Sequence, residues 1–436
     1  METAVKEAFL GSFKIEDAHL SYINLSNGKT ELETKGLSLR IDDLWLHNLP
    51  GDTLSHVLDL DEIEISMKSH SMDLPGNLYR IDIGPFEASY NDQDLKLDSL
   101  RLIPAYSKER FGQVVGKQTD RFAVSVDHLN ISGIEFDSLL NKKIIIDNIL
   151  LEGPYADIYR DKRIPRDMTH FPKLFQTSVA GIPMALFVKS INVSNGYVNY
   201  QEMAEGATQA GAVIFDKMDV LLTGVCNYAD SIKNGQAIRV DAQAQLMGKS
   251  PVQLYFKLPI GNKKEYFTFH GNVSSFPATN INSMIEPLAF IGATSGTVNS
   301  VNYYAVACCD TAIGRIEFKY QDLKVEVLKK NKDSEKASAE NKFLSFLAKT
   351  VMHKNNPHEG KPVRIARMSF VRNPNKGFFN YVWKTIQDGL IKSMTPGKKH
   401  LASDMSWPDF KARWEKNLWK DRQALNAKNS KKKGNK

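Results

Sequence analysis

Over most of its first 220 residues the chain alternates apolar and polar positions, which is the pattern of strands with one buried face. Four segments share the form φ-D-x-φ-x-φ, where φ is apolar. They are IDDLWL (41–46), LDSLRL (97–102), IDNILL (146–151) and FDKMDV (215–220). Each follows a strand-like stretch that ends at Tyr22, Tyr90, Phe136 or Tyr200, with a turn between the two. We therefore predict four β-hairpins, with each Asp solvated on the face opposite the apolar residues.

An isolated hairpin is only marginally stable in water, so repeated hairpins are expected to pair side by side. The sequence thus predicts a mainly β fold: a long, curved, antiparallel repeat sheet, shaped as a groove or half-pipe, with a few C-terminal helices. We divide the chain into a repeated-hairpin region (1–232), a region of longer strands (233–330), a helix–strand–helix cap (331–400) and a basic tail (401–436).

The second half contains the expected helices. Residues 281–290 carry apolar side chains at helical spacing, and Pro287 should end or kink that helix. Gln321 and Asp322 break the alternation of a long strand and predict a bulge. Apolar spacing predicts two further helices, 343–353 and 377–394, on either side of a strand at 362–370. The last helix is rich in aromatic residues, for which we favour packing on the sheet over binding to a membrane surface.

The basic character of the chain resides in its tail. The net charge is +7, and residues 398–436 alone carry +8. We predict that this tail folds weakly and binds an anionic membrane surface; the alternative is a solubilising tail. A nucleic-acid partner would rest on the tail alone, without a recognition helix or an RNA-stacking sheet, so we expect none.

Recognisable catalytic or metal-binding motifs are not present in the sequence. The three cysteines do not form a disulfide framework, and the histidines lack a metal-ligand spacing. A phosphate-binding glycine loop, a G-x-S-x-G elbow and an H-E-x-x-H motif are also missing. We expect no catalytic activity, no cofactor and no metal. The first residues carry acids where a signal peptide would be basic, and no run reaches the ~18 apolar residues of a membrane span.

The region from residue 276 to 328 resembles the C-terminal region of AsmA-like envelope proteins, in the branch found in Bacteroidota-type bacteria. In that family a helix with an N-x-x-x-x-P-L-like segment precedes G-x-[VL]-x-S, and a later strand ends in Y-x-D-L-K-V. The matching residues here are Asn282, Pro287, Leu288, Gly296, Val298, Ser300, Tyr320, Asp322, Leu323, Lys324 and Val325. The segment from Met368 to Met394, MSFVRNPNKGFFNYVWKTIQDGLIKSM, is similar to the end of the same proteins.

The resemblance implies a curved sheet with an apolar concave face, related to TamB and more distantly to bridge-like lipid transfer proteins. It implies a role in phospholipid transport or outer-membrane homeostasis, with a phospholipid or another acyl lipid as partner. It also implies a periplasmic location with an N-terminal membrane helix as tether. This sequence departs from the family there, because it contains no such helix.

The lead hypothesis is a non-enzymatic protein that covers acyl chains in an apolar β-groove. About fourteen methylenes cost on the order of 11 kcal/mol to expose to water, so covering them requires no catalytic residue. The candidate groove residues are Val240, Leu254, Phe256, Phe267, Phe269, Phe318, Tyr320, Val325 and Val327. A closed dry core would use the same residues. The alternative function is an envelope scaffold or assembly factor that binds unknown protein partners by strand-edge pairing.

Overall fold

The computed structural model describes residues 7–24, 29–47, 58–59, 62–228, 236–262, 264–328, 352–395 and 400–401. Its strands in the first half are β1 (Glu7–Asn24), β2 (Lys29–His47), β3 (Leu58–Asp59), β4 (Glu62–Met67), β5 (His70–Asp73), β6 (Tyr79–Ile83), β7 (Phe86–Ser89), β8 (Asp94–Leu97), β9 (Leu100–Pro104), β10 (Asp120–Val126), β11 (His128–Ile134), β12 (Lys143–Glu152) and β13 (Tyr155–Asp161). Those that follow are β14 (Ala185–Met203), β15 (Gly211–Cys226), β16 (Ala237–Leu246), β17 (Ser250–Pro259), β18 (Phe267–Val273), β19 (Phe276–Pro277), β20 (Ile291–Ala307), β21 (Thr311–Val327), β22 (Ile365–Val371) and β23 (His400–Leu401). The helices are α2 (Lys108–Val115), α3 (Phe136–Leu140), α4 (Phe175–Ala180), α6 (Asn282–Ala289) and α8 (Phe378–Met394), with a 3-10 turn at Ala278–Ile281.

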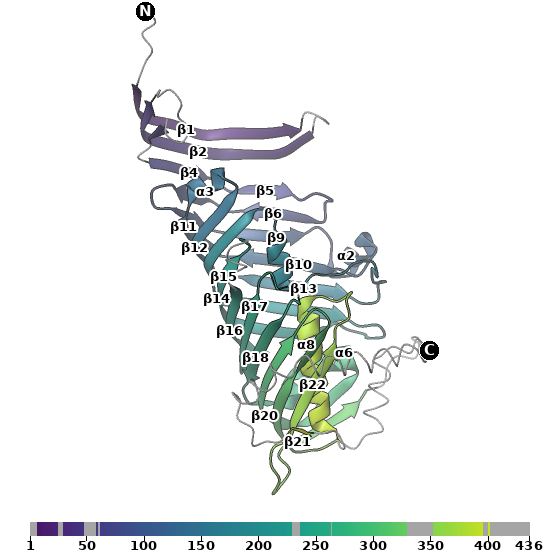
Figure 1. Ribbon diagram of the computed structural model, residues 1–436. Coiled ribbons are helices and arrows are strands. Elements are labelled where there is room, and N and C mark those ends of the chain that lie inside the picture. The colour runs from purple at the N-terminus through teal and green to yellow at the C-terminus, as the bar shows by residue number, and fades with distance from the viewer. Residues whose placement is uncertain are drawn as a thin grey trace, which may run out of the picture.

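All of these strands belong to one open sheet, which confirms the predicted mainly β fold (Figure 1). At many positions across the sheet, two short consecutive strands lie end to end and together form one line of the sheet, such as β10 with β11 or β12 with β13. Each line pairs with the next one along the chain: β8 with β11 and β9 with β10, then β11 with β12 and β10 with β13. All four predicted hairpins form, as β1–β2, β7–β8, β11–β12 and β14–β15.

One step in the sheet differs from the antiparallel prediction. The strand β14 runs parallel to both β12 and β13. Parallel neighbours need a long crossover, because the chain must return to the same end of the sheet before the next strand begins. Residues 162–184, which include α4, form this crossover. The alternation pattern reports strands but not their direction, so the sequence did not indicate this step.

Pairing across the sheet generates one continuous line of apolar residues, here called the apolar row. Each member is paired directly with the next, and paired residues on neighbouring strands point to the same face. The row is Ile15, Leu39, Ile65, Ala88, Leu95, Ile131, Ile149, Ile191, Leu222, Val240, Phe256, Phe269, Ala305, Gly314 and Met368. With strands about 4.8 Å apart, the row is roughly 65 Å long.

The residues one position along each strand form a second line that points to the opposite face. It is polar from β1 to β18 and ends less regularly. Its members are Lys14, Arg40, Glu64, Ser89, Asp94, Ser132, Asn148, Ser190, Thr223, Arg239, Lys257, Thr268, Val306, Ile313 and Ser369. The sheet is therefore amphipathic along nearly its whole length, with an apolar inner face and a polar outer face.

The φ-D-x-φ segments mark places where a strand interrupts its alternation. Residues three apart should lie on opposite faces, yet Ile146 and Ile149 both contact the same core. The residue opposite Asp147 is Gly133, which has a φ of 66°. A Cβ on that glycine would lie 2.5 Å from the Cβ of Asp147, so only glycine fits. In the other copies the interruption falls at Asp43 (φ 51°), at Lys217 (φ 47°) and in the gap between β8 and β9.

These interruptions bend the sheet while keeping its apolar residues on one side. Bulges and glycine kinks increase strand twist and curvature. Two further pairs of residues three positions apart lie on the same face, because both members of each pair contact the core. These pairs are Ile131 with Ile134 and Val188 with Ile191. The prediction of solvated Asp side chains holds for Asp98 and Asp147, which are exposed. It is wrong for Asp216, whose Oδ1 is buried, and only partly right for Asp42, which is half-buried and pairs with Arg40.

The expected C-terminal elements are present where the structure describes them. The helix α6 contains Pro287 and ends at Ala289, two residues later. Asn282 ties it to β20, since its side-chain amide accepts from the N–H of Ala293 and donates to the carbonyl of Ala293, both at 2.9 Å. The bulge at Asp322 is confirmed by its φ of 52° and by the register shifts of β20 against β21. Of the predicted helix 343–353, residues 343–351 lie outside the described residues, and Met352 and His353 are not helical. The tail beyond Leu401 also lies outside the described residues, and the predicted division into four regions stays a prediction.

The helix α8 packs against the inner face and closes one end of it (Figure 1). Phe378 lies 5.2 Å from Phe267 and 5.4 Å from Phe256, measured between ring centroids. Tyr381 is 1% exposed and contacts Phe267 edge-on. Core packing, as favoured from the sequence, thus holds for Phe378 and Tyr381, whereas Phe379 and Trp383 of the same helix are 75% and 39% exposed.

We predict that Gly389→Ala destabilises the protein by about 1–3 kcal/mol, the usual cost of overpacking. The new Cβ would lie 2.5 Å from Cγ2 of Ile316 and from Cγ of Met368. Ala inside a helix normally gains about 1 kcal/mol over Gly, so a loss points to the contact with the sheet. Urea unfolding measures the change. Gly11→Ala is the control, because its Cβ meets only the Phe9 ring at 3.7 Å; an equal effect of the two variants would contradict close packing of α8.

Candidate functional site

The nine candidate groove residues lie on one face of the sheet, but they differ in cover. Eight of them belong to the hydrophobic core cluster or pack against it: Val240, Leu254, Phe256, Phe267, Phe269, Phe318, Tyr320 and Val325. Val327 is 43% exposed. At this end of the sheet the apolar face is therefore a packed interior. The role of these residues as lipid contacts stays a prediction.

Cover of the apolar row decreases from one end to the other. Met368 and Phe269 are fully buried, whereas Ile65 and Ile15 are each 38% exposed. Of the helices that the structure describes, α6 and α8 pack on β14 and later strands. The helices α2 and α3 pack on β10, β12 and β13 and also contact Tyr79 of β6 and Tyr90, just after β7. Phe13, two residues from Ile15 and on the same face, is 40% exposed. The strands β1, β2 and β4, at the purple and blue end of the sheet in Figure 1, thus carry the half-exposed apolar side chains of Phe13, Ile15 and Ile65.

A second row of apolar residues crosses the sheet on β5, β6, β9, β10, β13, β14, β15 and β16. It consists of Met72, Ile81, Leu102, Val124, Ala156, Val198, Phe215 and Leu246, each paired directly with the next. On three of these strands, the residue four positions away from the row member is charged. These residues are Asp120, Arg160 and Glu202, and each is paired directly with the next. Positions two and four residues apart share a face of a strand. A line of charged residues therefore runs beside the second apolar row, about 13 Å away along the strands.

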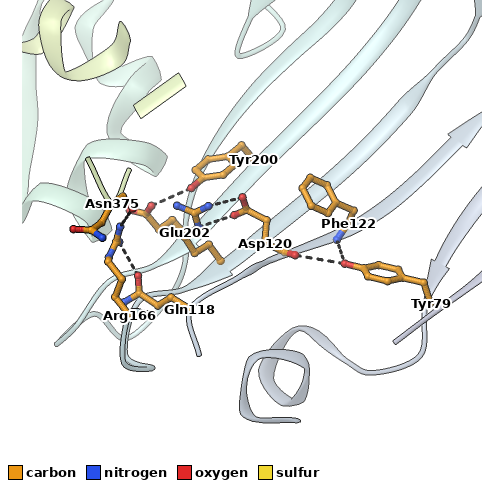
Figure 2. A network of polar contacts seen from close by, with 9 residues as sticks. Tyr79, Gln118, Asp120, Phe122, Arg166, Tyr200, Glu202 and Asn375 are labelled. Carbon is orange, nitrogen blue, oxygen red and sulfur yellow. Dashed lines mark hydrogen bonds and ion pairs between the residues drawn. The ribbon is translucent and has the colours of Figure 1, made fainter. Parts of the chain in front are cut away.

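These charged groups form a network with the crossover and with the loop before α8 (Figure 2). Arg160 donates through Nε to Oδ1 of Asp120 at 2.6 Å, and Lys162 forms an ion pair with Glu202. The Tyr200 hydroxyl donates to Glu202 Oε2 at 3.1 Å. Burial and the Glu202 charge raise the pKa of Tyr200, which keeps its proton on the hydroxyl.

Arg166 joins the network from the crossover. It donates to Oε1 of Gln118 at 2.8 Å and to the carbonyl of Asn375 at 3.3 Å. Asn375 in turn donates to the carbonyls of Met168 and His170 at 2.8 and 3.0 Å. The parallel step of β14 and the start of α8 thus bring together residues more than 200 positions apart, which no local pattern could predict.

Two cations of this network form no ion pair among the described residues, although the charge of Glu202 acts on both. Within the part of the chain that the structure describes, neither Arg166 nor Lys376 has a carboxylate within 4 Å. Both are partly buried. Burial, together with the charges of Arg166 and Lys162, lowers the pKa of Lys376 from 10.5 to about 8. We call Arg160, Lys162, Arg166 and Lys376 the cationic cluster.

Cys308, Cys309 and Asp310 are close enough to one another to hold a metal ion. The Cys308 thiol lies 3.3 Å from Oδ1 of Asp310 and 3.4 Å from the carbonyl of Thr311. Burial raises the pKa of this thiol to about 11, and metals bind the thiolate rather than the thiol. The contacts of this thiol with Asp310 and Thr311 lie within the turn that joins β20 to β21.

A depression of about 330 Å³ lies over the outer face of β17, β18, β20 and β21. Tyr255 and His270 stack in it with ring centroids 4.6 Å apart. The two residues are a direct cross-strand pair. Ordinary pairing of adjacent strands accounts for this arrangement, and no charged group converges on it beyond Arg315 and Glu317.

Comparison with known proteins returned no match to a family model and no similar curated protein. None of the helices in the described ranges is both long and apolar enough to cross a bilayer.

We predict that Lys376→Met stabilises the protein at pH 7, because it removes a desolvated charge but keeps the side-chain length. The native Lys376 loses its proton near pH 8, whereas the unfolded chain keeps it until about pH 10.5. The unfolded state then binds more protons over this interval, so the wild-type protein gains stability there and the difference from the variant narrows. Melting temperatures of both proteins at pH 7, 8.5 and 10 measure this difference in stability. Lys189→Met, which removes an exposed partner of Asp147, should show no gain at pH 7; a pH-independent difference for Lys376→Met would contradict the low pKa.

Proposed function

We propose that this chain is a non-enzymatic lipid-handling protein that covers acyl chains on the inner face of its sheet. The observation that carries the proposal is the apolar row, which continues from a buried end at Met368 to a half-exposed end at Ile15. A soluble domain normally covers apolar residues on such a long sheet with helices or a second sheet. Among the described residues, α6 and α8 pack on β14 and later strands, whereas α2 contacts Tyr79 of β6 and α3 contacts Tyr90, just after β7.

The chemistry of the open part suits an acyl chain. Its side chains are aliphatic or aromatic, and the neighbouring outer-face positions Lys14, Arg40 and Glu64 are charged. Moving an acyl chain from water onto the inner face would contribute about 0.8 kcal/mol of favourable free energy for each methylene that becomes buried. The roughly 65 Å row is about twice the ~30 Å thickness of a bilayer's hydrocarbon core, which suits movement between membranes.

The resemblance of residues 276–328 to AsmA-like proteins supports placing this activity in the periplasm, in phospholipid transport or outer-membrane homeostasis. The motif residues whose structure we describe serve the fold: Asn282 fastens α6, and Gly296 (φ 108°) lies against Leu323 opposite the Asp322 bulge. The resemblance thus bears on architecture, and the open apolar face bears on cargo.

One observation favours the alternative, a scaffold that binds a protein partner by edge pairing. In the described residues, β1 is an 18-residue strand that pairs on one side only, with β2. A long, exposed edge strand is a template for another strand. Such a partner would extend the sheet rather than cover its inner face.

Photo-crosslinking in living cells tests the proposal. We expect lipid adducts when a photoreactive residue replaces Phe13 or Ile65, and few when it replaces Lys14 or Glu64. These controls are adjacent in sequence but point to the outer face. Phe269, which α8 and the core bury, should label less than Ile65. Equal labelling on both faces, or protein adducts in place of lipid at Phe13 and Ile65, would reject the lipid proposal; the second outcome favours the scaffold.

A further inference from the structure

The cationic cluster lies where an amphiphile on the second apolar row would place its polar end. Val124 and Val198 belong to that row. Phe122 and Tyr200 lie two residues further along the same strands, and Asp120 and Glu202 four residues further. Phe122 is 37% exposed. The face therefore changes from apolar to charged over roughly 13 Å, the span of four strand residues.

The charge balance of this region calls for an anion. Asp120 and Glu202 are each engaged by one cation, Arg160 and Lys162 respectively. Among the described residues, Arg166 and Lys376 form no ion pair, although each is partly buried. The charges of Arg166 and Lys162 act on Lys376, the charge of Arg160 acts on Arg166, and Glu202 is a carboxylate whose charge reaches both. Holding two like charges together out of water is unfavourable unless a counter-charge accompanies them.

The geometry of these groups is fixed before any ligand arrives. Two hydrogen bonds hold Arg166, one to Gln118 and one to the Asn375 carbonyl. Lys376 is the next residue after Asn375, and Gly377 is the N-cap of α8 without a side-chain capping bond. A guanidinium can offer a phosphate two donors in a fork, and an ammonium adds a compact charge.

We propose that the cationic cluster is a headgroup site for an anionic phospholipid whose acyl chains lie on the second apolar row. The inference rests on the proposed function, because it assumes a lipid cargo. It adds selectivity: the protein should prefer a lipid with an anionic phosphate headgroup over a neutral one with the same chains.

Equilibrium binding of fluorescent lipids to the full chain tests this site. The two probes are phosphatidylglycerol and diacylglycerol with identical acyl chains. The wild-type protein should bind phosphatidylglycerol at least about tenfold more tightly, as expected for a hydrogen-bonded charge pair. The double variant Arg166→Gln/Lys376→Gln should lose most of this preference and bind diacylglycerol as the wild type does. Lys376→Arg alone, which keeps the charge, should retain it.

A matched control separates the cluster from overall charge. Lys96→Gln/Lys189→Gln removes the same two charges from exposed residues that already pair with Asp94 and Asp147. This variant should keep the preference. Inorganic phosphate should compete weakly, because it has no chains to bury; complete displacement of phosphatidylglycerol by equimolar phosphate would overturn a lipid headgroup site.

The remaining outcomes distinguish the two proposals. If the wild type binds neither lipid, the proposed function fails. If it binds both lipids, but the double variant keeps the full preference for phosphatidylglycerol, the headgroup site fails and the proposed function stands.

Discussion

The structure depends on keeping one face of a very long sheet apolar. Each strand shows alternate residues to opposite faces, so a single slip of register would turn every following apolar side chain outward. The apolar row keeps its register from Ile15 to Met368 across hairpins, a parallel crossover and several strand interruptions. Curvature, core packing and the open apolar surface all follow from that continuity.

The same constraint explains which parts the sequence could reveal. Alternation and the φ-D-x-φ segments predicted the hairpins, and apolar spacing predicted α6 and α8. The interruptions were not foreseen at the φ-D-x-φ segments, because apolar residues three apart, such as Ile146 and Ile149, fit either strict alternation or a switch of faces. Only the partner strand, with Gly133 opposite Asp147, resolves the difference. The cationic cluster was also missed, because its members come from β13, the crossover and the loop before α8, which meet only through the parallel step of β14.

The burial of the inner face differs between the two ends of the sheet, and we assign stability to one end and lipid binding to the other. At the α8 end, Phe267, Phe269 and Tyr381 supply a dry core that can anchor the fold. Toward β1, the same inner face lacks such a cover among the described residues, and its side chains remain half exposed. Within the described residues, Arg166 of the crossover and Lys376 before α8 form no ion pair. Both features cost stability in the absence of a partner, and an anionic lipid would offset both.

The most direct test of this account is the lipid content of the protein as it leaves the cell. The full chain is purified without detergent, extracted with organic solvent, and its lipids are counted against protein by mass spectrometry. The account predicts acyl lipid in at least stoichiometric amount, enriched in anionic phospholipid relative to the membranes of the same cells. Protein that is free of acyl lipid, yet folded and monodisperse, would contradict the claim that the open apolar face exists to cover lipid.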